Sequence, residues 1–349
     1  MVEHLQEQVR TAAHEQRPLR IRGGGTKDWY GQSLEGEILD TRFHAGIVDY
    51  EPTELVITAR CGTPLAEIEA ALLEKRQMLA FEPPHFGTGA TLGGAIASGL
   101  SGPRRANSGA VRDFVLGAKL LDGKGDVLSF GGQVMKNVAG YDVARLLAGS
   151  LGTLGLLLEV SVKVLPIAVA ETTLRFSLSE PDAIRKLNEW AGRPLPLSAS
   201  CWHDGVLALR LSGARAAVND AMRVLGGEVM PDCAGFWAAL REQRHAFFAG
   251  GMPVWRLSLP STAGALDLGA QLIEWGGAQR WLRLPADAAT AQRIRAAASA
   301  VGGHATLFRG GDKSVGVFQP LAPALARIHQ RLKAGFDPSG IFNPGRMHQ

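Results

Sequence analysis

Apolar and polar residues alternate in short runs along the first half of the chain, and glycine-rich segments separate these runs. Leu5 and Val9 fall on one face of an amphipathic helix predicted over residues 3–16. The other elements expected in this half are strands at 19–22, 55–59 and 156–164, helices at 64–75 and 141–147, a hairpin of 114–121 and 126–130, and a long loop at 83–110.

Beyond Pro166 the pattern changes to short strands that alternate with helices. Strands are expected at 171–177, 198–201, 205–212, 255–259 and 277–284, and helices at 180–190, 214–225, 286–301 and 321–334. This alternation is typical of an α+β layer with an antiparallel sheet. It predicts a first domain over 1–168, an α+β cap domain over 169–312, and a C-terminal segment, 313–349, that returns to the first domain.

The composition is that of a folded protein, with 46% apolar and 20% charged residues among 349. The net charge is +4, and the basic residues are scattered among acidic ones. This pattern fits weak attraction to an anionic ligand or an ordinary solvated surface, and it does not resemble a nucleic-acid footprint. Three separate cysteines offer neither a disulfide framework nor the four thiolates of an iron–sulfur cluster. A reducing, cytoplasmic location is therefore expected, and no secretory signal or transmembrane helix is predicted.

Three glycine-rich segments within the first 155 residues carry the chemistry of this sequence. They are Arg22-Gly-Gly-Gly-Thr26-Lys27, the stretch 87–102, and Gly149-Ser-Leu-Gly-Thr-Leu-Gly155. Such segments let backbone N–H groups approach an anion, although each alone could also be a tight turn or close strand packing. Neither the dinucleotide fingerprint nor a Walker A loop is present. Together the segments favour a long ligand with a pyrophosphate in its middle.

These segments, with the ending Phe336-Asp-Pro-Ser-Gly-Ile-Phe-Asn-Pro-Gly-Arg346, resemble the FAD-contacting stretches of the vanillyl-alcohol-oxidase superfamily in order and spacing. The resemblance covers about half of the chain and implies a PCMH-type, two-subdomain FAD-binding fold with an α+β cap. The run 134–155 resembles the E subunits of bacterial glycolate oxidase in particular. Leu151 departs from the related catalytic D subunits, which usually carry Glu there.

The resemblance assigns roles around FAD to twenty residues. The pyrophosphate would be held by Gly23, Gly24, Gly25 and Thr26. The isoalloxazine and ribityl path would be lined by Thr91, Gly93, Gly94, Ala97 and Ser98. The diphosphate and ribose would be flanked by Ser108, Gly109 and Asp113, and the adenosine end would meet Gly152, Thr153 and Leu156. The flavin would be closed over by Asn343 and Arg346, and the set is completed by Arg22, Lys27 and Gly149.

The resemblance also implies a place in an enzyme complex that oxidises glycolate to glyoxylate. The expected partners are a D-type FAD-linked catalytic subunit and an F-type iron–sulfur subunit, which could hold this chain peripherally at the inner membrane. Two alternatives stay open: a self-sufficient FAD oxidase or dehydrogenase of another 2-hydroxy acid or alcohol, and a scaffold that has lost the flavin. Some relatives attach the flavin to a histidine where this chain has Thr26-Lys27, so non-covalent FAD is expected.

Catalytic side chains are not identifiable from the sequence. The nine histidines form no H-x-x-x-H pair, and no metal site is expected. The histidine-rich cap motif of the D-2-hydroxy-acid dehydrogenases is not found, and the nearest fragment, His203-Asp204-Gly205, is predicted to be a turn between strands. We therefore expect this FAD to relay electrons or to have a structural role. We also expect the isolated chain to oxidise glycolate poorly.

Overall fold

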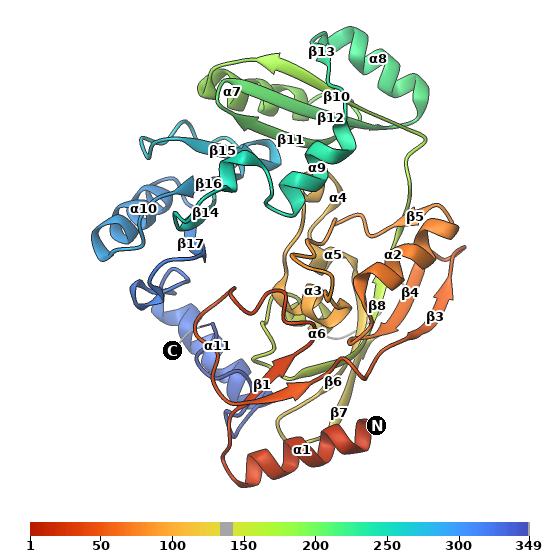
Figure 1. Cartoon of the computed structure of the whole chain (residues 1–349), viewed down its shortest axis with the longest axis vertical. Coiled ribbons are helices and arrows are strands. Elements are labelled where there is room, and N and C mark those ends of the chain that lie inside the picture. Colours follow the sequence, from red (N-terminus) through yellow and green to blue (C-terminus); the bar gives the residue numbers. More distant parts are fainter. Residues whose placement is uncertain (133–141, 348–349) are drawn as a thin grey trace. The chain divides into compact units, whose positions relative to one another are not determined.

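The computed structural model describes residues 1–132 and 142–347. The chain divides into two compact units (Figure 1). Unit 1 comprises Met1–Leu100, Ala110–Pro166 and Pro320–Gln349, and unit 2 comprises Ser101–Gly109 and Ile167–Gln319. Part of the 134–155 run and Tyr141, the first residue of a predicted helix, lie outside the described residues.

Unit 1 is built on a five-stranded antiparallel sheet with the order β3-β4-β8-β6-β7. Its strands are β3 (Ile47–Glu51), β4 (Val56–Arg60), β6 (Val115–Leu121), β7 (Val127–Gly131) and β8 (Leu156–Lys163). The predicted hairpin is confirmed, because β6 and β7 pair antiparallel around a turn in which Asp122 Oδ1 accepts hydrogen bonds from two backbone N–H groups. The central strand, β8, has six of its eight residues buried, which explains its continuous apolar sequence.

Two smaller sheets complete the strands of unit 1. They are the parallel pair β1 (Leu19–Arg22) and β2 (Glu37–Asp40), and the antiparallel pair β5 (Gln77–Met78) and β9 (Leu165–Pro166). The helices of this unit are α1 (Val2–His14), α2 (Leu65–Glu74), α3 (Leu92–Ser98), α5 (Val111–Phe114), α6 (Val143–Leu147) and α11 (Pro323–Phe336). Helices α2, α3 and α6 share one buried core with the five-stranded sheet. Helix α1 buries Leu5 and Val9 against a second core that includes Leu19 and Phe342.

The predicted loop at 83–110 is wrong in part, because residues Leu92–Ser98 form α3. Thr91 caps this helix by accepting a hydrogen bond from the Gly94 N–H, and Gly99 ends it with a left-handed φ of 64°. Small residues let the helix approach the sheet closely, since a Cβ on Gly93 would lie 2.7 Å from the Cβ of Cys61. Gly93 therefore serves close packing of this helix, and Gly99 serves to end it.

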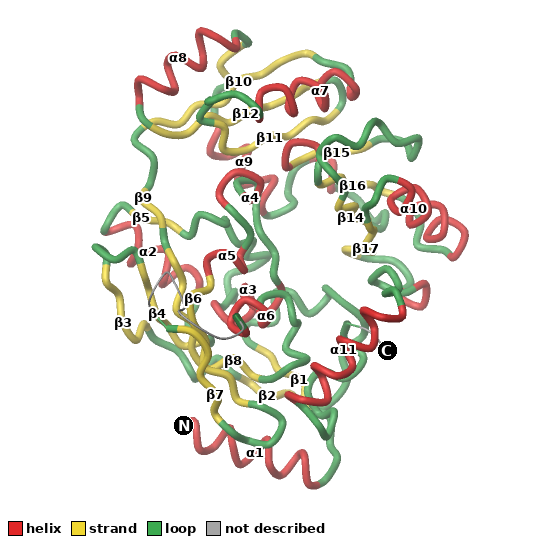
Figure 2. Tube along the Cα trace, turned by 180° about the vertical axis from the view of Figure 1, so that it is seen from behind, coloured by secondary structure: helices red, strands yellow, loops and turns green. Residues whose placement is uncertain are grey.

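Unit 2 contains one antiparallel sheet of eight strands in the order β13-β10-β12-β11-β15-β16-β14-β17, which confirms the predicted α+β layer (Figure 2). Its strands are β10 (Ala170–Ser177), β11 (Leu197–His203), β12 (Val206–Gly213), β13 (Glu228–Val229), β14 (Val254–Ser258), β15 (Gln271–Glu274), β16 (Gln279–Arg283) and β17 (His304–Arg309). Its helices are α4 (Arg105–Ser108), α7 (Glu180–Ala191), α8 (Arg215–Leu225), α9 (Cys233–Arg241), α10 (Ala288–Ala300) and the 3₁₀ turns η1 (Ala246–Phe248), η2 (Trp275–Gly277) and η3 (Lys313–Val315).

The sheet of unit 2 consists of two halves with the same strand order. The first half runs β10-α7-β11-β12-α8-β13, the succession of the split βαβ motif. The second half runs β14-β15-β16-α10-β17, with residues 259–270 in place of the first helix, and β11 joins β15 between the halves. Helices α7 and α8 share one core with the first half, and α10 shares another with the second.

The predicted turn at His203-Asp204-Gly205 is confirmed. β11 ends at His203 and β12 begins at Val206, and both intervening residues have positive φ, 48° for Asp204 and 75° for Gly205. Two successive left-handed residues are what a tight hairpin turn requires. Within the described residues, no helix is both long enough and apolar enough to cross a bilayer.

Candidate functional site

A pocket in unit 1 brings the predicted glycine segments together with the C-terminal segment. Twelve of the twenty predicted residues line it, namely Arg22, Gly23, Gly24, Gly25, Thr26, Lys27, Thr91, Gly94, Ala97, Ser98, Asn343 and Arg346. Four lining residues were not predicted: Ile21, Asp28, Leu34 and Leu151. The pocket thus collects residues separated by more than 300 positions along the chain.

The first two glycine segments pack directly on each other. A Cβ on Gly24 would lie 1.5 Å from the carbonyl oxygen of Gly89, and a Cβ on Gly23 would lie 2.5 Å from Thr91 Oγ1. Real Cβ contacts are never so short, so both positions require glycine for the contact between the two loops. The protein's own backbone packing therefore accounts for these glycines before any ligand is considered.

The second and third glycine segments are joined in a similar way. The Gly149 N–H donates to Ile96 O over 3.0 Å, and the Leu151 N–H donates to Ala97 O over 2.8 Å. A Cβ on Gly99 would lie 2.8 Å from the Cα of Gly149, so the two backbones are in contact here. These contacts fix the end of α3 against the third segment.

The loop after β1 nevertheless offers backbone donors to an anion. The N–H groups of Gly24, Gly25 and Thr26 donate to no acceptor among the described residues. All three residues are only partly buried and line the pocket. Backbone N–H groups that line a pocket without an acceptor can bind phosphate oxygens. That this loop holds the diphosphate of FAD stays a prediction.

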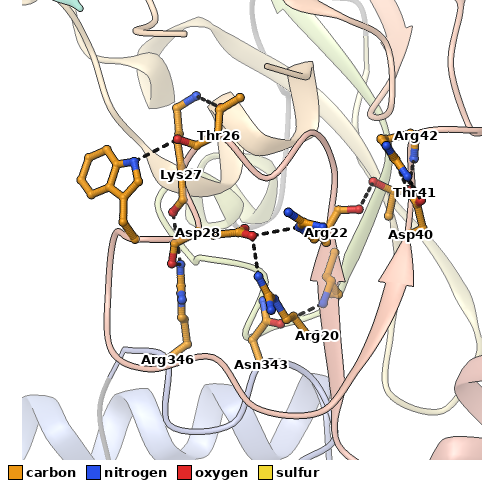
Figure 3. A network of polar contacts seen from close by, with 12 residues as sticks. Arg20, Arg22, Thr26, Lys27, Asp28, Asp40, Thr41, Arg42, Asn343 and Arg346 are labelled. Atoms are coloured by element: carbon orange, nitrogen blue, oxygen red, sulfur yellow. Dashed lines mark hydrogen bonds and ion pairs between the residues drawn. The ribbon is translucent and has the colours of Figure 1, made fainter. Parts of the chain in front are cut away.

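Charged side chains hold this loop in place (Figure 3). The Asp28 carboxylate forms an ion pair with Arg20, and it accepts a hydrogen bond from Arg22 Nε over 2.8 Å. Arg20 and Arg22 both lie on β1, so Asp28 turns the loop back onto the strand from which it came. Asp28 could have been suspected from the sequence, since it lies shortly after the glycines and has two arginines close by.

Lys27 and its neighbours form the side of the pocket near residues 85–86. Lys27 Nζ donates to the carbonyl oxygen of His85 over 3.3 Å and lies 5.8 Å from the centre of the Phe86 ring. The Trp29 indole N–H donates to Thr26 O over 3.0 Å, and its ring packs edge-on against Phe86. The lysine is thus largely buried, with its cation held beside the loop.

Arg346 holds the same loop from the C-terminal segment. Its guanidinium donates to the backbone carbonyls of Lys27 and Asp28 at 3.3 and 3.1 Å (Figure 3). It also donates to the carbonyl of Gln32 at 3.0 Å. Burial lowers the pKa of Arg346 to about 10, and the nearby Asp28 carboxylate opposes this shift. The guanidinium stays charged at neutral pH because this pKa remains well above 7. The predicted closing of the flavin by Arg346 stays a prediction.

Not all predicted residues line the pocket. Gly93 faces Cys61, and Gly149 faces Gly99. The others that do not line the pocket are Ser108, Gly109, Asp113, Gly152, Thr153 and Leu156. Of these, Ser108 and Gly109 belong to unit 2, whereas the Asp113 carboxylate accepts a hydrogen bond from the Ala110 N–H in unit 1. Contact of these residues with FAD stays a prediction.

Comparison with known proteins decides the family. The chain is 52% identical to the glycolate oxidase subunit GlcE of Escherichia coli, over 99% of this chain and 96% of that protein. This chain belongs to the GlcE family. Residues 1–131 match the family described as FAD binding domain. These findings confirm the predicted resemblance and FAD as the cofactor, and they do not favour the self-sufficient oxidase.

Two further comparisons place the family among its relatives. The glycolate oxidase subunit GlcD of Bacillus subtilis is 32% identical over 45% of this chain and 34% of that protein. The solved structure of alkyldihydroxyacetonephosphate synthase superposes with a TM-score of 0.67 at 15% identity, covering 98% of this chain and 75% of that one. This structural likeness confirms the predicted fold class.

Proposed function

We propose that this chain is the FAD-binding subunit of a multi-subunit glycolate oxidase, an oxidoreductase that converts glycolate to glyoxylate. The observation that carries the proposal is the 52% identity to the Escherichia coli subunit along 99% of the chain. The pocket of unit 1 adds support, because it is lined by a glycine loop that matches the FAD binding domain. Three N–H groups of this loop have no acceptor among the described residues.

The residues of this pocket would bind FAD without a covalent bond. The N–H groups of Gly24, Gly25 and Thr26 would hold the diphosphate, and Arg346 would keep their loop in position through its three carbonyl contacts. No histidine or cysteine is among the described residues that line the pocket. When bound, FAD supplies the redox chemistry of the complex.

The chain would act together with other subunits. A D-type FAD-linked subunit would oxidise the substrate, and an F-type iron–sulfur subunit would carry electrons onward, since three cysteines cannot ligate a cluster here. The FAD of this chain would relay electrons or stabilise the assembly. The complex would be cytoplasmic, with contact to the inner membrane made through the partner subunits.

The deciding experiment is a comparison of glycolate:dye reductase turnover by the isolated, FAD-loaded chain and by the reconstituted complex. We expect turnover by the isolated chain to be lower by roughly 10²-fold or more, the contribution of a placed general base. Equal turnover in both samples would contradict the proposal that another subunit oxidises the substrate, and it would favour a stand-alone enzyme.

A further inference from the structure

Helix α11 differs from every other described helix of eight or more residues, because none of its residues is buried. It spans 14 residues, Pro323–Phe336, and leads directly into the C-terminal segment that lines the pocket. A helix in a globular unit normally buries an apolar stripe, and helical stability depends mostly on that packing. The exposure of α11 therefore needs an explanation.

The helix does have an apolar stripe. Leu325, Ile328, Leu332 and Phe336 are spaced so that they fall on one face. The second half of this stripe packs against the core of unit 1 through Leu332 and Phe336. The first half is open, with Leu325 44% and Ile328 54% exposed. The stripe thus continues beyond the surface that the unit itself covers.

The charged side chains of α11 all have the same sign. Its ionisable side chains are all basic, and it contains no Asp or Glu. Lys333 is used within unit 1, where it pairs with Asp337. Arg327 and Arg331 are exposed and form no ion pair or hydrogen bond with the described residues. Arg331 stands one turn beyond Ile328 and so lies beside the open part of the stripe.

We propose that the open part of the stripe, Leu325 and Ile328, is a docking surface for another subunit of the oxidase, together with the basic edge formed by Arg331 and, one turn before it, Arg327. The partner would present an apolar groove with carboxylates along its rim. This inference rests on the proposed function, which requires partner subunits. The surface would place the partner on the helix that leads into Asn343 and Arg346 of the cofactor pocket.

The same observations disfavour other occupants. A second copy of this chain would bring one exclusively basic helix against another, and like charges oppose such contacts. A membrane-surface helix needs a continuous apolar face, whereas here only two large apolar side chains are open and the other two of the stripe pack on the core. An acidic protein surface matches both the short apolar stretch and the unpaired arginines.

The test is co-purification of the native subunits with the tagged full-length chain. The double variant Leu325→Glu/Ile328→Glu should retain roughly tenfold less of its partners than the wild type. The matched control, Val169→Glu/Val224→Glu, changes two apolar residues that are 70% and 57% exposed and should retain them fully. Acidic residues near a helix N-terminus favour the helix, so the variant should fold, and its FAD content and melting temperature check this.

Charge reversal provides a second arm. The variant Arg327→Glu/Arg331→Glu should retain less of the partner subunits than the wild type. Added salt should weaken the retention of these subunits by the wild type, and it should have a smaller effect on this variant. Full retention by both double variants would overturn the docking surface. So would a wild-type homodimer, or binding to anionic vesicles, that Leu325→Glu/Ile328→Glu abolishes. A wild-type chain that captures no subunit would instead contradict the proposed function itself.

Discussion

The side-chain amide of Asn343 donates a hydrogen bond to the carbonyl oxygen of Leu151 over 2.6 Å. Its Oδ1 accepts a hydrogen bond from the Ile21 N–H over 2.9 Å. One side chain thereby connects the C-terminal segment, the third glycine segment and β1, all at the edge of the pocket. Asparagine also tolerates the left-handed backbone found here, with φ of 41°.

We predict that Asn343→Asp weakens FAD binding. The substitution keeps the acceptor for Ile21 but removes the donor and places a carboxylate oxygen against Leu151 O. A partly buried carbonyl left without its donor costs about 1–3 kcal/mol, which corresponds to roughly 5- to 150-fold in Kd if the pocket forms less readily by that amount. Fluorescence titration with FAD measures the change, and exposed Asn107→Asp is the matched control. Equal Kd values for the two variants would show that Asn343 does not shape the pocket.

A second prediction concerns Gly24→Val, which should abolish FAD binding. The clash with Gly89 O separates the first two glycine loops, so the pocket is lost even before crowding of the pyrophosphate matters. Gly264→Val is the control, because a Cβ there meets no atom within 4 Å. Absorbance of the purified proteins near the flavin bands reports the cofactor content. Normal flavin content in Gly24→Val would contradict the observed loop contact.

A third prediction is that the flavin dissociates when the protein is denatured. Thr26 and Lys27 stand where some relatives attach FAD through histidine, and both line the pocket without a nucleophile suited to that linkage. Acid precipitation should release the yellow colour into the supernatant. Colour that stays in the washed pellet would demonstrate a covalent bond and refute this prediction.

The fold was predictable wherever one face of an element meets a core. The alternating and continuous apolar runs predicted β1, β8 and the hairpin correctly. Strand β8 buries six of its eight residues, β1 buries Leu19, and β7 packs Phe130 against the core. Helix α3 was missed because Leu92-Gly-Gly-Ala-Ile-Ala-Ser98 has the composition of a loop. The sequence did contain a helical signal, namely the capping residues Thr91 and Gly99, which flank the seven residues of the helix.

The pocket was predictable in outline but not in its internal contacts. The motifs identified the loop at 22–27 and the ending at 343–346, and the structure brings them together. The sequence did not reveal that Arg346 is committed to three backbone carbonyls. Such long-range pairing of a side chain with backbone groups leaves no local pattern. Leu151 was missed for the same reason, because its carbonyl pairs with the distant Asn343. Asp28, in contrast, has both of its arginine partners close by in the sequence.

A fourth prediction concerns Lys333, whose ammonium donates to Asp337 Oδ2 over 2.5 Å and to Thr153 O and Phe342 O, both over 2.7 Å. The Asp337 residue is 1% exposed, so Lys333→Met would leave a buried carboxylate without its counter-ion. Because the Lys333 side chain is itself 28% exposed, we expect the free energy of unfolding to fall by about 2–3 kcal/mol, less than for a fully buried pair.

Urea unfolding measures this loss, and Lys119→Met is its matched control. Lys119 pairs with Glu159 over 2.8 Å, but its side chain is 51% exposed, so its removal should cost less than about 1 kcal/mol. Similar losses in the two variants would mean that the contacts of Lys333 with the C-terminal segment contribute no more than a surface ion pair.

The fifth prediction concerns acid stability and His44, which is 4% exposed in unit 1. Burial lowers the pKa of His44 below 6.5, the Arg60 cation lowers it further, and Glu159 opposes the shift. In the unfolded chain the imidazole takes up a proton as the pH falls through about 6.5, whereas the folded protein resists protonation. His44 is therefore neutral in both states above that pH, and stability is lost progressively below it.

His44→Gln should accordingly narrow the difference in melting temperature between about pH 7.5 and about pH 5. It should not abolish the difference, because burial also lowers the pKa of His245 and His304. Exposed His14→Gln is the control and should leave the difference as in the wild type. Thermal unfolding followed by circular dichroism at the two pH values gives the comparison. If His44→Gln shows the wild-type difference, protonation of this buried imidazole does not govern the acid stability of unit 1.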